Sequence, residues 1–362
     1  MKRAFIFGYY GFKNLGDEAI LSSIVKMIKE KNPSTQIYAL SYNVKYTEKV
    51  HKIKGVSRNS IKDIISTIKN SDIVISGGGS LLQDVTSSRS LLYYLAIIQV
   101  AKLFKKTVLF FCNGFGPIRK RYNKYLAKKI INRVDKIVLR DQESKKLMEE
   151  IGVTKEIDVT VDSTFYLESV DETRVKKILE KEDIPTDKPL IGISVRPWYV
   201  KEDFIDTMAS FGDYISDKGL NVLFIPMQAS KDEKVSKEIM DKMKNKSYIL
   251  TKEYTSEEVL GVIGALDILI GMRLHALIFA SIKGIPMIGL EYDPKVKAFL
   301  RMVNQRSGGK VEELDNFNLC IEFDNLWNKR DHEAEELCSI GANLKDIVRK
   351  NKDILNDMLK WV

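Results

Sequence analysis

The chain has 362 residues, of which 44% are hydrophobic and 30% are charged, a composition typical of a soluble globular protein with more than one core. The longest apolar run, residues 91–100, is too short to span a bilayer, and Met1-Lys-Arg leads directly into an apolar strand, so we expect neither a membrane span nor a signal peptide. The three cysteines are widely spaced without a metal-ligand pattern, which favours a reduced, cytoplasmic protein with no metal site.

The net charge of +9 is unevenly distributed along the chain. Residues 1–165 contain 29 Lys and Arg against 15 Asp and Glu, a balance of +14, whereas the remainder carries −5. The excess of positive charge in residues 1–165 favours an anionic partner such as a phosphate, a nucleic acid or a membrane surface. We see no helix-turn-helix, zinc-finger or RNA-recognition signature and therefore expect no nucleic acid.

Residues 1–165 alternate apolar runs with amphipathic segments, which predicts a parallel sheet with helices on both faces. The predicted strands are residues 4–7, 36–40, 72–76, 107–111 and 136–139. The predicted helices are residues 17–31, 90–105, 122–132 and 142–150.

The second half repeats this pattern after a charged linker, residues 166–188, that contains a helix at 171–181. Its predicted strands are residues 190–195, 221–226, 248–250, 267–270 and 286–290. Its predicted helices are residues 204–216, 231–244, 256–265, 274–283, 296–304 and 344–359. We therefore predict an α/β fold of two Rossmann-like, doubly wound domains that face each other across a cleft. The domains are residues 1–168 and 186–340, and a helix in residues 341–362 can cross back to the first domain.

Three glycine-bearing loops follow strands of the first domain, at the sheet edge where open parallel sheets bind ligands. The first loop, from residue 8 to residue 19, lacks the G-x-G-x-x-G spacing of a dinucleotide site. Its Tyr10 and Phe12 are suited to stacking on a sugar ring, Asn14 to bonding sugar hydroxyls, and Asp17 to capping the next helix. Burial of these aromatic rings in the core is the alternative.

The second and third loops, residues 76–84 and 112–117, continue this edge. Consecutive glycines bring backbone N–H groups close to an anion, although a plain tight turn explains them equally well. We expect Cys112 to be a small buried side chain rather than a nucleophile. The candidate cleft residues of these loops are Gly78, Gly79, Ser80, Gln83, Asp84, Asn113 and Gly114.

Two basic features complete the first half. Arg140 follows a strand and is placed either to grip a carboxylate or phosphate or to form a salt bridge with Asp141. The segment 119–136 predicts a helix with an apolar stripe at Tyr122, Leu126 and Ile130, suited to anionic lipid headgroups or a pyrophosphate, or simply solvated. Its cations, opposed by Asp135 alone, are Arg119, Lys120, Arg121, Lys124, Lys128, Lys129, Arg133 and Lys136.

Cations and one imidazole cluster at two strand ends of the second half. Arg273 and His275 follow the strand at 267–270, and Lys295 follows the next strand. Such a set suits a small, highly charged anion whose chemistry needs a proton. Glu291 and Asp293 are interpreted either as an acid or base or as helix caps. The other two histidines, His51 and His332, lie in charged sequence expected to form loops, so His275 is the catalytic candidate.

Read in chain order, six motifs resemble those of the polysaccharide pyruvyl transferases, in particular the cell-surface-anchoring (CsaB) type of Gram-positive bacteria. They are Gly8-Tyr-Tyr-Gly-Phe-Lys-Asn-Leu-Gly-Asp-Glu-Ala, Gly77-Gly-Gly-Ser-Leu-Leu-Gln-Asp, Gly114-Phe-Gly-Pro, Leu139-Arg-Asp, Met272-Arg-Leu-His-Ala and Tyr292-Asp-Pro-Lys. The resemblance implies a glycosyltransferase-B-like arrangement. Lys13 enlarges a position expected to be small.

The resemblance also implies a function: transfer of pyruvate from phosphoenolpyruvate (PEP) to the 4,6-hydroxyls of N-acetylmannosamine in a lipid-pyrophosphate-linked wall precursor, for S-layer anchoring. PEP would be the co-substrate, held by Arg140, Lys295, Arg273 and Leu274, with His275 as general acid. No further cofactor is implied. The enzyme would be cytoplasmic and peripheral to the inner membrane face. A nucleotide-sugar glycosyltransferase with Glu291 as ribose ligand is the alternative enzyme, and an inactive glycolipid-binding scaffold the alternative without catalysis.

Overall fold

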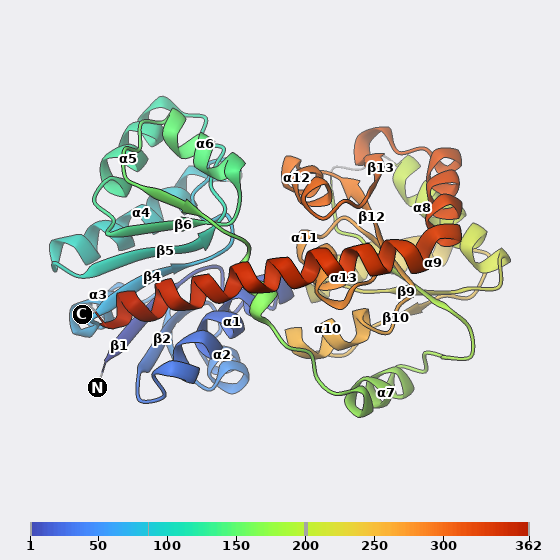
Figure 1. The fold of residues 1–362 in the computed structure, drawn as a ribbon, viewed down its shortest axis with the longest axis horizontal. Coiled ribbons are helices and arrows are strands. Elements are labelled where there is room, and N and C mark those ends of the chain that lie inside the picture. The colour runs from blue at the N-terminus through green and yellow to red at the C-terminus, as the bar shows by residue number, and fades with distance from the viewer. Residues whose placement is uncertain (1, 86, 199–201, 361–362) are drawn as a thin grey trace. The chain divides into compact units, whose positions relative to one another are not determined.

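The structure, a computed structural model, describes residues 2–85, 87–198 and 202–360 (Figure 1). The chain divides into two compact units. The N-terminal unit comprises Met1–Leu167 and Leu344–Val362, and the C-terminal unit comprises Glu168–Asn343. The helix α7 (Glu172–Lys181), expected in a linker, belongs to the C-terminal unit, where Arg174 pairs with Glu258.

The N-terminal unit contains, within the described residues, a seven-stranded parallel sheet in the order β3-β2-β1-β4-β5-β6-β7. The strands are β1 (Arg3–Phe7), β2 (Gln36–Ser41), β3 (Lys54–Ser57), β4 (Ile73–Gly77), β5 (Thr107–Asn113), β6 (Lys136–Leu139) and β7 (Ile157–Val159). The order reverses between β1 and β4, and open parallel sheets bind ligands outside the carboxyl ends of the strands at such a reversal.

The helices of this unit are α1 (Leu15–Lys31), α2 (Val44–His51), α3 (Ile61–Asn70), α4 (Ser88–Leu103), α5 (Arg121–Ile131) and α6 (Gln142–Glu150), followed by the short η1 (Ser163–Tyr166). Side chains such as Phe5, Val74 and Phe110 are fully buried, which is expected of central strands covered by helices on both faces. The predicted elements match the observed ones to within two residues, but β3, β7, α2 and α3 were not predicted.

The C-terminal unit holds a second parallel sheet, in the order β10-β9-β8-β11-β12-β13. Its strands are β8 (Leu190–Ser194), β9 (Asn221–Phe224), β10 (Tyr248–Ile249), β11 (Ile268–Gly271), β12 (Met287–Glu291) and β13 (Arg306–Lys310). Its helices include α8 (Glu202–Asp217), α9 (Ala229–Lys242), α10 (Ser256–Ile263), α11 (Leu274–Lys283), α12 (Pro294–Met302) and the short η2 (Val311–Glu313). The strand order reverses between β8 and β11. The predicted α/β class with two doubly wound sheets is confirmed.

The last helix, α13 (Asn316–Lys360), is far longer than the predicted 344–359. Its first part buries Leu319 and Phe323 in the C-terminal unit, and its last part belongs to the N-terminal unit. There the fully buried Asn351 donates from Nδ2 to the Cys112 sulfur at 3.1 Å and to the Val161 carbonyl at 3.2 Å. None of the described helices is both long and apolar enough to cross a membrane.

Candidate active site

The loops after β1 and β4 flank the reversal point of the N-terminal sheet and are packed tightly by glycines. Gly11 has φ +78°, and a Cβ there would meet Ser41 Oγ at 2.2 Å, so the first loop can lie against the end of β2 only with glycine at this position. Gly79 has φ +66°, and its Cβ position lies 3.1 Å from Asp17 Oδ1. The two loops therefore adjoin each other at the sheet edge.

Tyr10 does not present its ring for sugar stacking, so that interpretation is wrong. Its side chain is 1% exposed, and its hydroxyl donates to the Gly77 carbonyl. Burial raises the pKa of the phenol well above its ordinary value, and the nearby carboxylate of Asp17 adds to the effect. Tyr10 is a core residue that ties the first loop to β4.

The polar residues of the first loop have structural partners. Asn14, rather than the predicted Asp17, caps α1, and its side chain accepts from Gly16 N at 3.2 Å. Asp17 lies in the first turn instead, where its carboxylate interacts favourably with the positive end of the helix dipole. Lys13, the residue larger than expected, adopts the left-handed conformation with φ +56°.

A buried acid–imidazole pair supports this loop and was not predicted. Glu18 is 1% exposed and accepts from Gly11 N at 2.8 Å, while its other oxygen lies 2.8 Å from His51 Nε2. His51, expected in a loop, is the last residue of α2 and is 7% exposed. Its position at a helix end could have been predicted had the amphipathic α2 been recognised.

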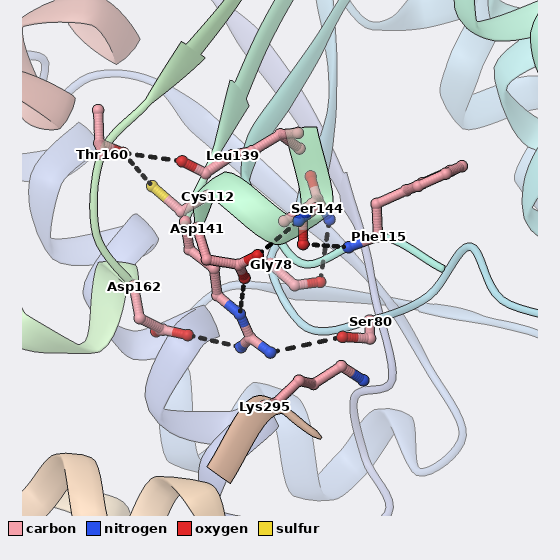
Figure 2. Close-up of polar contacts among 12 residues, drawn as sticks. Gly78, Ser80, Cys112, Phe115, Leu139, Asp141, Ser144, Thr160, Asp162 and Lys295 are labelled. Atoms are coloured by element: carbon pink, nitrogen blue, oxygen red, sulfur yellow. Dashed lines mark hydrogen bonds and ion pairs between the residues drawn. The ribbon is translucent and has the colours of Figure 1, made fainter. Parts of the chain in front are cut away.

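Arg140 is 7% exposed, and its guanidinium is held by three residues of the N-terminal unit, Asp162, Ser80 and Asp141, which are labelled in Figure 2. Its Nη1 donates to Asp162 at 2.8 Å, its Nη2 donates to Ser80 Oγ at 3.4 Å, and its Nε lies 3.6 Å from Asp141. Burial opposes the charge, but the carboxylates of Asp162 and Asp141 outweigh it and raise the pKa of Arg140. Gly114 lies against the guanidinium, and any larger residue would crowd it, because a Cβ there would lie 3.0 Å from Nη2. Sequence reasoning missed Asp162, which lies beyond the strand after Arg140.

The remaining residues of the second and third loops are mostly buried. Asn113 is 4% exposed and donates to Ser76 Oγ and the Gly78 carbonyl, both at 3.1 Å. Asp84 is 8% exposed and accepts hydrogen bonds from the backbone of Arg119 and Lys120. Asp84 therefore anchors the basic segment instead of offering polar reach into a cleft. Gln83 is only partly exposed.

Cys112 is fully buried, as expected, and burial raises the pKa of its thiol well above the ordinary value. Such a thiol is a poor nucleophile.

The basic segment forms α5 at the surface, but the predicted apolar stripe is only partly correct. Leu126 packs against the core, as does Ile130, whereas Tyr122 is 66% exposed. Tyr125 is 61% exposed, so two tyrosines project among the exposed cations of this segment.

In the C-terminal unit, Arg273 is the N-cap residue of α11, at the carboxyl edge beside β8. Its guanidinium forms a two-point ion pair with Asp232 of α9, with Nε 2.9 Å from Oδ2 and Nη2 bonded to Oδ1. Asp232 is completely buried and also accepts from the backbone N–H groups of Met227 and Gln228, at 3.1 and 2.9 Å. The ion pair fixes Arg273 at the reversal point, and Asp232 was not predicted.

His275 lies in the first turn of α11, two residues after Arg273 and next to Leu274. It is partly exposed, and its Nε2 atom is buried. Lys295 lies in the first turn of α12, which Asp293 caps by accepting from Lys295 N at 2.9 Å. The capping interpretation of Asp293 is thus confirmed.

Glu291, at the end of β12, accepts from Ser307 Oγ at 2.7 Å and lies 3.5 Å from Lys297. Its carboxylate therefore binds β13 and α12 rather than capping a helix.

Sequence reasoning also missed Arg196, which follows β8 directly across the reversal point from β11. Its guanidinium lies 4.8 Å from the ring centre of Tyr292 and 5.5 Å from that of Trp198. Its Nε is buried and, among the described residues, has no hydrogen-bond partner. The signal in the sequence was an arginine at a strand end with a tryptophan two residues later.

These positions correspond to a known family. A protein-family model described as polysaccharide pyruvyl transferase matches residues 14–294. The chain belongs to the polysaccharide pyruvyl transferase family. The match begins within the first loop, includes the second and third glycine loops as well as Arg140, Arg273 and His275, and ends one residue before Lys295.

Among curated relatives of this pyruvyl transferase family member is the amylovoran biosynthesis protein AmsJ of Erwinia amylovora, 23% identical over an alignment of 263 positions that covers 65% of this chain. The match spans 60% of the length of AmsJ. Among solved structures, HepE of Anabaena in complex with UDP-glucose aligns over the whole of both chains with a TM-score of 0.68 and 12% identity. The UDP-GlcNAc 2-epimerase of Neisseria meningitidis aligns over 99% of this chain and 100% of its own, with a TM-score of 0.64 and 16% identity. These likenesses show a glycosyltransferase-B-like fold.

Proposed function

We propose that the chain is a ketalpyruvyl transferase that moves pyruvate from PEP to two hydroxyls of a sugar. Family membership supports the reaction class. The observation that carries the proposal is at the reversal point of the C-terminal sheet. There Arg273 and Arg196 follow neighbouring strands, and His275 lies in the first turn of α11. Two guanidinium groups suit the carboxylate and phosphate of PEP, and an imidazole exchanges a proton near neutral pH.

The chemistry requires one proton donor and several cations. His275 protonates the methylene carbon of PEP, and the resulting oxocarbenium-like carbon accepts a sugar oxygen. The carbon–oxygen bond to phosphate then breaks, and a second sugar hydroxyl adds to close the ketal. One hydroxyl proton replaces the proton that His275 gave, and the other leaves with inorganic phosphate. Arg273, Arg196, Lys295, Arg140 and the backbone at Leu274 are proposed to stabilise the anionic groups.

For the acceptor we propose N-acetylmannosamine, modified at its 4,6-hydroxyls, in a lipid-pyrophosphate-linked precursor used to anchor S-layer proteins. The resemblance to the cell-surface-anchoring type supports this choice. The exposed cations of segment 119–136 provide electrostatic attraction for a pyrophosphate or for the anionic inner face of the membrane.

A nucleotide-sugar glycosyltransferase is the second candidate, because HepE, with the same fold, was solved in complex with UDP-glucose. In such an enzyme, Glu291 is the candidate for binding the ribose hydroxyls of the nucleotide. The carboxylate of Glu291 is engaged with Ser307 and Lys297, which disfavours this role.

The deciding experiment is incubation of the full chain with isotopically labelled PEP and a panel of lipid-linked and aryl glycosides. We expect one glycoside to gain the mass of pyruvic acid less one water and to carry the label. Glycosyl transfer from a nucleotide sugar under the same conditions, without any pyruvyl product, would replace our proposal with the second candidate.

Arg140 provides a test of donor binding. Arg140→Lys keeps the charge but loses the planar fork, so PEP affinity should fall by roughly 10-fold or more in titration calorimetry, while affinity for the sugar is unchanged. Lys136→Gln is the control, because it removes a cation that pairs with Asp158 on β7. A loss confined to sugar affinity would contradict a donor role for Arg140.

The membrane proposal is tested by charge reversal at Lys124, Lys128 and Lys129, all of them exposed. Each cation near an anionic surface contributes about 1 kcal/mol, so binding to phosphatidylglycerol vesicles at low salt should fall by at least about 100-fold. The matched control reverses Lys176, Lys177 and Lys181 on α7, which are also exposed. Equal vesicle sedimentation for wild type and the α5 variant would exclude this surface.

A further inference from the structure

Three aromatic rings form a stack at the carboxyl edge of the N-terminal sheet. Tyr9 and Phe12 come from the loop after β1, and their ring centres lie 3.9 Å apart with nearly parallel planes. Tyr42 directly follows β2 and stacks on Phe12 with ring centres 4.6 Å apart. Tyr42 is 59% exposed, so a flat aromatic side chain reaches solvent at the end of this stack.

Arg58, which follows β3, lies beside the same stack. Its guanidinium carbon is 5.1 Å from the ring centre of Phe12 and 5.3 Å from that of Tyr93 on α4. The backbone at Arg58 is fixed on both sides, because its N–H donates to the Ser41 carbonyl at 3.0 Å and its carbonyl accepts from the Tyr93 hydroxyl at 3.0 Å. No carboxylate pairs with Arg58 among the described residues.

This arrangement is unlike that of Arg140 and Arg273, whose guanidinium groups are bonded to buried carboxylates. A partly buried arginine oriented only by ring faces keeps its forked N–H donors available for an anion. Lys13, 5.9 Å above the ring of Tyr46, adds a second positive charge at this edge. Parallel strands place the ends of β1, β2 and β3 at one edge, so the stack and the cation share one surface.

We propose that Tyr42 and Arg58 form an acceptor subsite for a phosphate-linked sugar. The pyranose ring packs its apolar C–H face on Tyr42, and the phosphate binds the guanidinium of Arg58. A neutral sugar would leave Arg58 without an anion, and inorganic phosphate would leave the exposed ring uncovered, so the site favours a ligand with both parts. The inference rests on the proposed function only in assigning this ligand to the acceptor.

The test measures ligand binding without PEP, by ligand-observed NMR titration of the full chain. The probes are N-acetylglucosamine 1-phosphate, free N-acetylglucosamine and inorganic phosphate. We expect the sugar phosphate to bind at least about 10-fold more tightly than the free sugar, as a charge-assisted contact implies. Arg58→Gln should remove this difference, and Tyr42→Ala should weaken both sugars by roughly 2- to 10-fold.

Two controls match these variants. Lys62→Gln removes an exposed cation on the adjacent α3, and Phe317→Ala removes an exposed ring in the C-terminal unit. Both should bind like the wild type. If Arg58→Gln lowers stability, Arg58→Lys tests the same contact, because it keeps the charge without the planar fork.

Three results would overturn the subsite: unchanged binding by Tyr42→Ala, an unchanged phosphate preference in Arg58→Gln, or an equal loss in Lys62→Gln. Sugar-phosphate binding that depends on Tyr42 and Arg58, in a chain that transfers no pyruvyl group, would reject the proposed function but retain the subsite. Pyruvyl transfer that is unchanged in both Tyr42→Ala and Arg58→Gln would reject the subsite but retain the proposed function.

Discussion

His275→Ala should lower kcat for pyruvyl transfer by at least about 100-fold, because positioned acid catalysis contributes roughly 10²- to 10⁴-fold. Binding of PEP, measured by calorimetry, should change much less, since the arginines provide most of the charge that binds the donor. His275 occupies the first turn of α11, two residues after the N-cap Arg273, so its loss removes the proposed proton donor from the carboxyl edge of the C-terminal sheet.

The matched control is His332→Ala, an exposed histidine on α13 whose loss should leave kcat unchanged. Because the Nε2 atom of His275 is buried, His275→Gln provides a second variant that preserves more of the side-chain volume. The two substitutions should agree in kcat and in thermal midpoint. Turnover near the wild-type rate in either folded variant would remove His275 from the mechanism.

Asp232→Ala should destabilise the C-terminal unit by about 3–5 kcal/mol, because it leaves Arg273 without its buried partner. The carboxylate also accepts two backbone N–H groups, from Met227 and Gln228, and both would lose that bond. Denaturant unfolding followed by tryptophan fluorescence measures the effect, since Trp198 and Trp327 both belong to this unit.

A surface pair provides the comparison. Asp206→Ala breaks the exposed contact with Lys242, at 2.6 Å, and should cost no more than about 1 kcal/mol. The double variant Asp232→Leu with Arg273→Met replaces the whole buried pair and should recover much of the stability without recovering pyruvyl transfer. An active double variant would mean that Arg273 serves the fold alone.

The strands and helices that carry a clear apolar period were predictable from the sequence. Segments 107–111 and 274–283 are mostly apolar, and the structure buries most of their residues in a strand and a helix, as their sequence pattern predicts. The strands β3 and β13 escaped prediction because Lys54–Ser57 and Arg306–Lys310 are polar and glycine-containing, and they pair at or near sheet edges where little burial is required. Most of α13 was not predicted, because its first part is buried in the C-terminal unit and its last part belongs to the N-terminal unit.

Within the candidate site, residues named from strand ends lie at strand ends, but their partners were not predictable. Asp162 and Asp232 reach Arg140 and Arg273 from 22 and 41 residues away, a separation that no local pattern encodes. The sequence also did not indicate which of the tyrosine side chains would be exposed. Tyr10 and Tyr42 both lie in loops that follow a strand, yet Tyr10 is buried with its hydroxyl bonded to the Gly77 carbonyl, whereas Tyr42 projects into solvent.

The return of α13 to the N-terminal unit has a consequence for dissecting the molecule. A fragment ending at Leu167 would lack Asn351 and Asn356, which bond Cys112 and Asn32, and would uncover the surface that Leu355 fills. Expression of residues 1–167 alone should thus give an incomplete, aggregation-prone product. Adding a synthetic peptide of residues 344–362 should restore it, as in split-protein complementation.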